Sequence, residues 1–251
     1  MIQYLKPSFW RYALRDPLTW LAIAVDLTPI VFVFMFGWGA AALVLLYWAE
    51  NIVIGVATFA RIILSGIKSW GLIGGLGALF LAAFFTFHYG LFCYGHGVFV
   101  FEFAPGMNFS PPAPGPDGIT KMMQAVIVYA PGMAIALGLI ALYQTLAIVI
   151  DYWPTTERET PLPIVEMFSP YGRIAVLHVA IFAGAFAMAV LGDPMIGVLA
   201  LILLRAAFSL VGRSWRDNLE ANASPFDTPI KKKAAGSDDG SGFSWPYDED
   251  K

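Results

Sequence analysis

The stretch AAALVLLYWAENIVIGVATFARII (residues 40–63) is apolar enough to enter a membrane, yet it carries polar and charged side chains inside the run. A transmembrane helix needs about 20 mostly apolar residues, so this stretch is long enough to cross a bilayer. Tyr47, Glu50, Asn51 and Arg61 recur, with a threonine between them, at the spacing of one helical face. The stretch therefore predicts a membrane helix whose polar face is turned into a bundle.

The composition of the whole chain agrees with this interpretation. Of 251 residues, 58% are hydrophobic and 13% are charged, and the mean hydropathy is +0.68. These values are typical of a chain that resides in lipid, and they leave no room for a separate soluble domain. The predicted fold is all-α, a polytopic membrane helix bundle of about six helices. The predicted spans are 17–37, 40–63, 72–101, 122–150, 173–191 and 194–212.

Basic residues gather on one side of the predicted bundle. They precede the first span, follow the last, and occupy the second and fourth connections, whereas Lys121 is the only basic residue of the other three connections. The positive-inside rule then places both termini in the cytoplasm. The chain divides into a cytoplasmic interfacial segment (1–16), a six-helix transmembrane domain (17–212) and a cytoplasmic tail (213–251).

We also make predictions for the connections and for the tail. The brief GWG (37–39) predicts an antiparallel pair of helices, and tryptophans near span ends, Trp38 and Trp70 among them, are interpreted as interfacial anchors. The fourth connection, up to Arg173, mixes acids, prolines and aromatics, so we expect it to lie at the cytoplasmic interface. The tail is expected to be disordered alone, although its end, FSWPYDED, is compatible with docking onto a partner.

Ionisable side chains occur at similar depths in several predicted spans. At about 1.5 Å per residue, four of them lie about 15–18 Å from the outer end of their helix, and His178 lies a few Å deeper. Because such groups are costly in lipid, each is expected to face the interior and to have a partner or a function. The predicted polar cluster near the midplane comprises Asp26, Tyr47, Glu50, Asn51, His88, His178 and Arg205.

Several roles for this cluster are open. It could be a structural network that fixes helix register, or a path that binds and releases protons or ions. Glu50, His88 and His178 are also candidate ligands of a transition metal, and the two histidines could ligate a haem; neither cofactor is favoured. His96 lies nearer the outer surface, where a hydrogen bond across helices is expected.

Two segments resemble an uncharacterised family of bacterial multi-pass membrane proteins, known as a domain of unknown function. In that family a Tyr-Trp-x-Glu-Asn-like segment precedes a His-x-Gly-x-Phe-x-x-x-His-Gly-like segment. The matching residues here are Tyr47, Trp48, Glu50, Asn51, His88, Gly90, Phe92, His96 and Gly97. The resemblance implies only a membrane location and a shared motif. We expect the protein to reside in the bacterial cytoplasmic (inner) membrane. No catalytic residue can be transferred from that family to this chain.

The sequence favours a non-catalytic role. It has no phosphate-binding loop, nucleophile elbow, Cys-x-x-Cys or His-Glu-x-x-His, and no basic patch suited to nucleic acid. We therefore expect an accessory or structural subunit that packs, in the lipid bilayer, against a larger membrane complex, with the tail as a docking candidate. The alternatives are a small transporter or proton or ion pathway that uses Glu50 and His88, and an intramembrane metal- or haem-binding protein.

Overall fold

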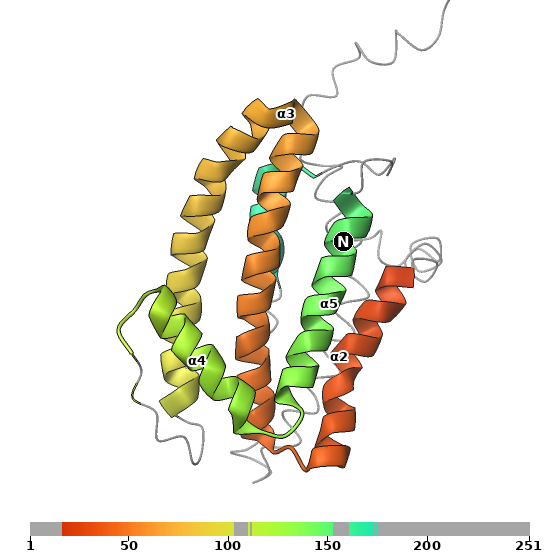
Figure 1. Cartoon of the computed structure of the whole chain (residues 1–251), viewed down its shortest axis with the longest axis vertical. Coiled ribbons are helices and arrows are strands. Elements are labelled where there is room, and N and C mark those ends of the chain that lie inside the picture. Colours follow the sequence, from red (N-terminus) through yellow and green to blue (C-terminus); the bar gives the residue numbers. More distant parts are fainter. Residues whose placement is uncertain (1–16, 103–109, 111, 153–160, 173, 175–251) are drawn as a thin grey trace, which may run out of the picture.

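A computed structural model describes residues 17–102, 110, 112–152, 161–172 and 174 of the chain. The secondary structure of these residues is entirely helical, which confirms the expected all-α class. The helices, in order, are α2 (Pro17–Phe36), α3 (Ala40–Glu102), α4 (Pro116–Tyr129) and α5 (Met133–Tyr152), followed by a short helix at residues 163–172 (Figure 1). The expectations for segments 1–16, 175–191, 194–212 and 213–251 lie outside the described residues.

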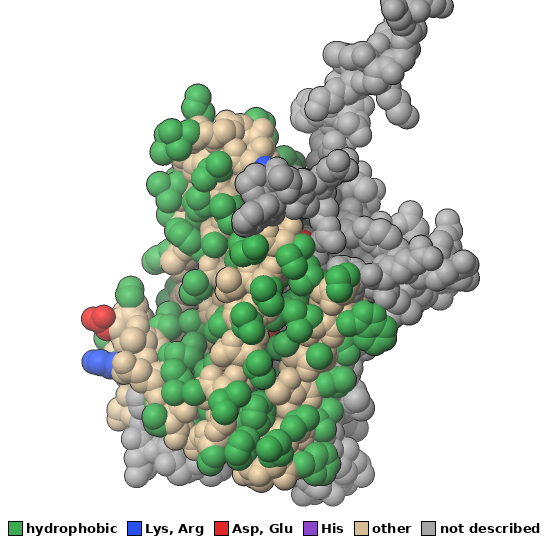
Figure 2. Space-filling model, turned by 45° about the vertical axis from the view of Figure 1, so that its right-hand side comes forward, with side chains coloured by type: hydrophobic (Ala, Val, Ile, Leu, Met, Phe, Trp, Pro, Cys, Tyr) green, Lys and Arg blue, Asp and Glu red, His purple; other side chains and the backbone are tan. Residues whose placement is uncertain are grey.

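Three of these helices, α2, α3 and α5, are long and apolar enough to cross a membrane. The helices α2 and α5 have 20 residues each, which corresponds to about 30 Å, the thickness of the hydrocarbon core. The face of the molecule seen in Figure 2 is covered mostly by hydrophobic side chains, as expected for a surface in contact with lipid. The described part of the chain therefore has the composition and dimensions of a membrane protein.

The helix α3 folds back on itself and forms a helical hairpin. Its 63 residues are helical except at Trp70 and at Gly71, where φ is 65° and ψ is −154°. Only glycine adopts such a left-handed backbone without a steric cost. The chain reverses here, so that a first arm (40–69) and a second arm (72–102) lie side by side (Figure 1). The arms correspond to the predicted spans 40–63 and 72–101, but the connection between them is shorter than expected.

Small residues let the two arms approach closely. A Cβ atom added to Gly66 would lie 2.5 Å from the Ala78 Cβ, and one added to Gly55 would lie 2.8 Å from the Tyr89 ring. Further along, Trp48 Nε1 donates a hydrogen bond of 2.9 Å to the Cys93 carbonyl. As residue numbers fall along the first arm, those of the contact partners rise along the second. The arms are therefore antiparallel, and they pack through the small-residue contacts typical of membrane helices.

The predicted span 122–150 is wrong as a single helix. It is interrupted after Tyr129 by Ala130, which is extended, by Pro131, and by Gly132 with a φ of 82°. Proline lacks the N–H that would continue a helix, and a left-handed glycine ends one. The result is two helices. The 14 residues of α4 are too short to span a bilayer, and α4 carries the acidic and basic side chains seen at the edge of Figure 2.

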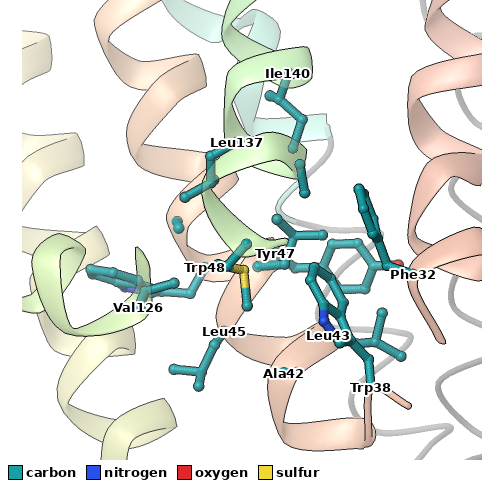
Figure 3. Packing of buried hydrophobic residues seen from close by; sticks show 14 of the residues in the cluster. Phe32, Trp38, Ala42, Leu43, Leu45, Tyr47, Trp48, Val126, Leu137 and Ile140 are labelled. Atoms are coloured by element: carbon teal, nitrogen blue, oxygen red, sulfur yellow. The ribbon is translucent and has the colours of Figure 1, made fainter. Parts of the chain in front are cut away.

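The main core lies at the end of the bundle where α2 joins α3. Phe32 of α2, Leu45 of α3, Val126 of α4 and Leu137 of α5 belong to one cluster of buried hydrophobic residues (Figure 3). Trp38, expected to be an interfacial anchor, is buried in this cluster and donates a hydrogen bond of 2.8 Å to the Pro131 carbonyl. That expectation was wrong because the indole lies inside the bundle, where it links the connection between α2 and α3 to the connection between α4 and α5.

The segment 163–172 also differs from expectation. It was expected to lie at the membrane interface, but it forms a helix that packs against both arms of α3. Met167 and Ile174 join a second buried cluster with Ile62 of the first arm and Phe85 of the second. Pro163 stands at the first helical position, where a missing N–H costs nothing. The apolar side of this segment is therefore part of the interior.

Candidate functional site: a buried polar stripe

Polar side chains follow one face of the first arm of α3 over most of its length. Tyr47, Glu50, Thr58, Arg61 and Ser65 are all buried. They are spaced by three, four or seven to eight residues, which keeps them on one face of a helix. From Tyr47 to Ser65 this face extends about 27 Å along the axis. We call these five residues the polar stripe.

The stripe meets α5 at the end of the bundle where α3 reverses. Arg61 Nη2 donates a hydrogen bond of 2.8 Å to Oε1 of Gln144, which is also buried. One helical turn beyond the stripe, Lys68 Nζ lies 3.4 Å from the carbonyl oxygen of Asp151. This end of the bundle therefore contains buried polar contacts beside its apolar ones.

A second carboxylate reaches the same end from the segment 163–172. Glu166 is fully buried and accepts a hydrogen bond of 2.8 Å from the Tyr152 hydroxyl, at the last residue of α5. The Ser65 hydroxyl donates a hydrogen bond to the Pro161 carbonyl, two residues before this helix. Arg61, Lys68, Asp151 and Glu166 thus supply two positive and two negative formal charges, and mixed signs of this kind lower the cost of burying each charge.

At the level of Glu50 the stripe is linked to the second arm. Asn51 Nδ2 donates to the Tyr47 carbonyl (2.9 Å), and the Asn51 carbonyl accepts a hydrogen bond of 3.1 Å from the Tyr89 hydroxyl. Glu50 itself is 4% exposed. Tyr89 therefore links the second arm to the first arm beside Glu50. The common depth of Glu50 and His88 stays a prediction.

The predicted midplane cluster is described only in part. Asp26 on α2 is buried, like Tyr47 and Glu50, whereas His88 is exposed. The His88 ring stacks on Phe84 at 5.8 Å and lies 6.3 Å from the Tyr171 ring. His178 and Arg205 lie outside the described residues. The described part of the chain contains no group of three or more His, Cys, Asp or Glu side chains that could hold a metal ion, so the predicted metal ligands stay a prediction.

His96 lies two turns beyond His88 on the second arm and is half-buried. Its Nδ1 lies 3.0 Å from the Phe92 carbonyl of its own helix, and its ring centroid lies 4.0 Å from that of Phe92. A carbonyl oxygen accepts and never donates, so this Nδ1 carries the proton.

Sequence reasoning missed the polar residues that the stripe meets on other elements. Gln144 and Asp151 are buried on α5 at the same 3–4 spacing as its apolar core positions, a pattern that could have shown that they face inward. Glu166 had no such signal, because its segment was interpreted as a connection. Ser65 fell beyond the predicted end of the span at residue 63.

The comparison with protein families bears on most of the chain. The model of a family of unknown function, DUF6498, matches residues 9–225. The chain belongs to the DUF6498 family. This confirms the expectation of an uncharacterised family. No curated protein and no solved structure matches the chain. Among the residues described for this DUF6498 member, the polar stripe is therefore the strongest guide to function.

Proposed function

We propose that this DUF6498 member is a multi-pass integral membrane protein that passes protons along the polar stripe. The observation that carries the proposal is the burial of Tyr47, Glu50, Thr58, Arg61 and Ser65 on one helical face. That face, about 27 Å long, compares with a hydrocarbon core of about 30 Å. Polar and ionisable groups at such depth are rare unless they mark a proton or ion path.

The proposed arrangement in the membrane follows from the fold. The helix α2, the two arms of α3 and α5 each cross the bilayer, and α4 lies at the outer interface with Asp117 and Lys121 exposed. With the two spans expected after residue 174, both termini lie in the cytoplasm. The reversal at Trp70–Gly71 and the end of the stripe with Arg61 then face the cytoplasm of a bacterial cell, across its inner membrane.

The side chains of the stripe supply a chemistry suited to proton transfer. Glu50 is a carboxyl near mid-depth and can hold or release a proton, while the hydroxyls of Tyr47 and Thr58 can both donate and accept. Asp151 and Glu166 offer further carboxyls at the cytoplasmic end. Arg61 is a fixed positive charge in this path.

The proposal is tested in proteoliposomes that contain the purified full chain and a trapped pH-sensitive dye. A potential is imposed with potassium and valinomycin, and the rate of dye response is measured. We expect a proton flux above that of empty liposomes, and a fall to within twofold of empty liposomes for Glu50→Gln. Glutamine keeps the size of the side chain but cannot ionise.

The matched control is Asp117→Asn, which makes the same chemical change at an exposed carboxylate of α4. We expect its flux to equal that of the wild type. Gel filtration and circular dichroism establish that both variants are folded. Equal fluxes for Glu50→Gln and the wild type, or a wild type no faster than empty liposomes, would refute the proposal.

A second candidate function, the accessory subunit, is favoured by the outward face of the second arm. His88 is exposed there among aromatic residues, and Phe87 is 74% exposed. An imidazole that faces lipid near mid-depth is costly, whereas one that faces a partner helix can form a hydrogen bond. On this hypothesis another membrane protein covers His88.

This second candidate predicts the size of the particle extracted from native membranes. Native gels in a mild detergent should show a complex larger than the chain, and His88→Leu should release the chain from it. Phe59→Leu, at an exposed position of the first arm, should leave the complex intact. An unchanged complex in His88→Leu would argue against this interface.

A further inference from the structure

Thr58 of the polar stripe differs from four other threonines in the described helices. In those four the hydroxyl donates to the backbone carbonyl four residues earlier, at 2.8–2.9 Å; they are Thr28, Thr86, Thr120 and Thr145. A threonine inside a helix commonly satisfies its hydroxyl in this way. The Thr58 hydroxyl is fully buried and has no hydrogen-bond partner among the residues that the structure describes. It is therefore turned away from its own backbone carbonyls and into the packed interior.

The helix α5 supplies the nearest buried polar side chain across from Thr58. Arg61 hydrogen-bonds to Gln144, which is 83 positions further along the chain. The contact of Lys68 with the Asp151 carbonyl joins residues with the same separation of 83. A constant separation means that the first arm and α5 run in the same direction at one register. Thr58 lies one turn before Arg61 on the same helical face. Of the two buried polar residues of α5, Gln144 is therefore the one close to Thr58 in height.

The two side chains have hydrogen-bonding groups that their known contacts do not use. Gln144 Oε1 accepts the hydrogen bond from Arg61, whereas the two N–H donors of its Nε2 take no part in that bond. The Thr58 hydroxyl can both donate and accept. Because a buried polar atom without a partner costs free energy, such atoms usually have one. Buried waters supply these partners in folded proteins, each with about three hydrogen bonds. The groups at this height are suited to hold a water molecule.

We propose that Thr58 and Gln144 bind an ordered water molecule inside the bundle, beside Arg61. The Gln144 amide donates to the water oxygen, and the water donates to Thr58 Oγ1. Both side chains are buried, Thr58 completely and Gln144 with 5% of its surface exposed. A water in this position gives the threonine hydroxyl the partner that its own backbone does not provide.

The role of this water as a proton relay rests on the proposed function of the polar stripe. Glu50 lies eight residues before Thr58, a distance of about 12 Å along the helix axis. Two groups exchange a proton directly only over a hydrogen bond of about 3 Å, or through one water. The buried residues Ile54 and Ala57 lie between them in the sequence and are apolar. Protons that pass from Glu50 toward Arg61 therefore need water on the way, and Thr58 marks one place where it is held.

The water is detected by solid-state NMR of the full chain in liposomes. Threonines are labelled with carbon-13, and magnetisation is transferred from water protons to the threonine carbons. The Thr58 signal is assigned by its disappearance in Thr58→Val. The reference is Thr145, which is exposed on α5 next to Gln144 and bonds the Ala141 carbonyl. We expect the Thr58 signal to build up faster than that of Thr145 by about twofold or more. Equal or slower build-up at Thr58 would overturn the inference.

Thermal unfolding gives a second measurement that does not depend on proton transfer. Valine keeps the shape of threonine but lacks the hydroxyl. If a water is bound, Thr58→Val leaves it without one of its partners, and we expect the melting temperature to fall by about 2–4 °C. Thr145→Val should change it by about 1 °C or less. A rise for Thr58→Val would overturn the inference, because removal of an unpartnered hydroxyl stabilises a site that holds no water.

Proton flux in proteoliposomes tests the role of the water. We expect Thr58→Val to lower the flux several-fold and Thr58→Ser, which keeps a hydroxyl, to recover most of the loss. Thr145→Val is the matched control with unchanged flux. A water signal at Thr58 in a chain that passes no protons would confirm the water site and refute the proton path. A water signal with equal fluxes for Thr58→Val and the wild type would overturn the relay.

Discussion

Arg61 and Gln144 show how this protein buries a charge near the membrane interior. The guanidinium donates to a neutral amide at 2.8 Å, and carboxylates stand about one to two turns away on α5 and on the segment 163–172. A buried polar group that loses its partner has to bear the full cost of desolvation. The amide of Gln144 is therefore expected to matter more for stability than its lack of charge suggests.

We expect Gln144→Leu to lower the free energy of unfolding by about 1–3 kcal/mol, because it removes the acceptor of the Arg61 hydrogen bond. The measurement is the thermal unfolding of the purified protein in detergent. Gln124→Leu makes the same change at an exposed position of α4 and should change stability by less than about 0.5 kcal/mol. Equal effects of the two variants would contradict this prediction.

At the scale of residues, the sequence predicted that several polar side chains of α2 and α3 face inward. Tyr47, Glu50 and Asp26 are buried, as helical spacing and the cost of charge in lipid require. The partners of these residues could not be predicted, because spacing within a helix says nothing of the neighbouring helix. His88 illustrates this limit, because its side chain is exposed on the second arm and spacing alone did not predict that.

At the scale of elements, the hairpin of α3 depends on glycines at the contact between its arms. Gly66 and Gly77 provide a matched pair, because both are helical glycines near the reversal. A Cβ atom at Gly66 would meet Ala78 at 2.5 Å, whereas one at Gly77 would meet nothing within 4 Å. The two positions separate the packing effect of a methyl group from its effect on helix propensity.

Gly66→Ala is expected to destabilise the protein by about 1–3 kcal/mol, since the added methyl group forces the arms apart. Gly77→Ala should be neutral or stabilising by up to about 1 kcal/mol, because alanine is the better helix former. Both are measured by thermal unfolding in the same detergent. A stability loss for Gly77→Ala as large as that for Gly66→Ala would refute the packing argument.

The elements that were predicted wrongly have different causes. Apolar character continues through Ala130, Pro131 and Gly132, so hydropathy did not separate α4 from α5, although proline and glycine together are a common helix stop. In the segment 163–172, prolines and an acid suggested a connection. Met167 nevertheless packs against residues of both arms of α3, and only the tertiary fold brings those arms together.

At the scale of the whole molecule, the proposed orientation is accessible to labelling. In a Cys93→Ala background, Asp117→Cys should react with a membrane-impermeant maleimide in intact cells, because α4 is placed outside. Trp70→Cys, at an exposed position of the reversal, should react only after permeabilisation. Labelling of Trp70→Cys in intact cells would invert the proposed orientation, and with it the cytoplasmic end of the polar stripe.

The reversal at Trp70–Gly71 also bears on how the chain enters the membrane. Closing a long loop between two helices costs entropy that grows with loop length, and here only two residues depart from the helix. Contacts such as Gly66 with Ala78 are also close in sequence, and local contacts form fastest. During synthesis the two arms can thus insert together as a preformed unit. We therefore expect this hairpin to form early, before α5 packs against it.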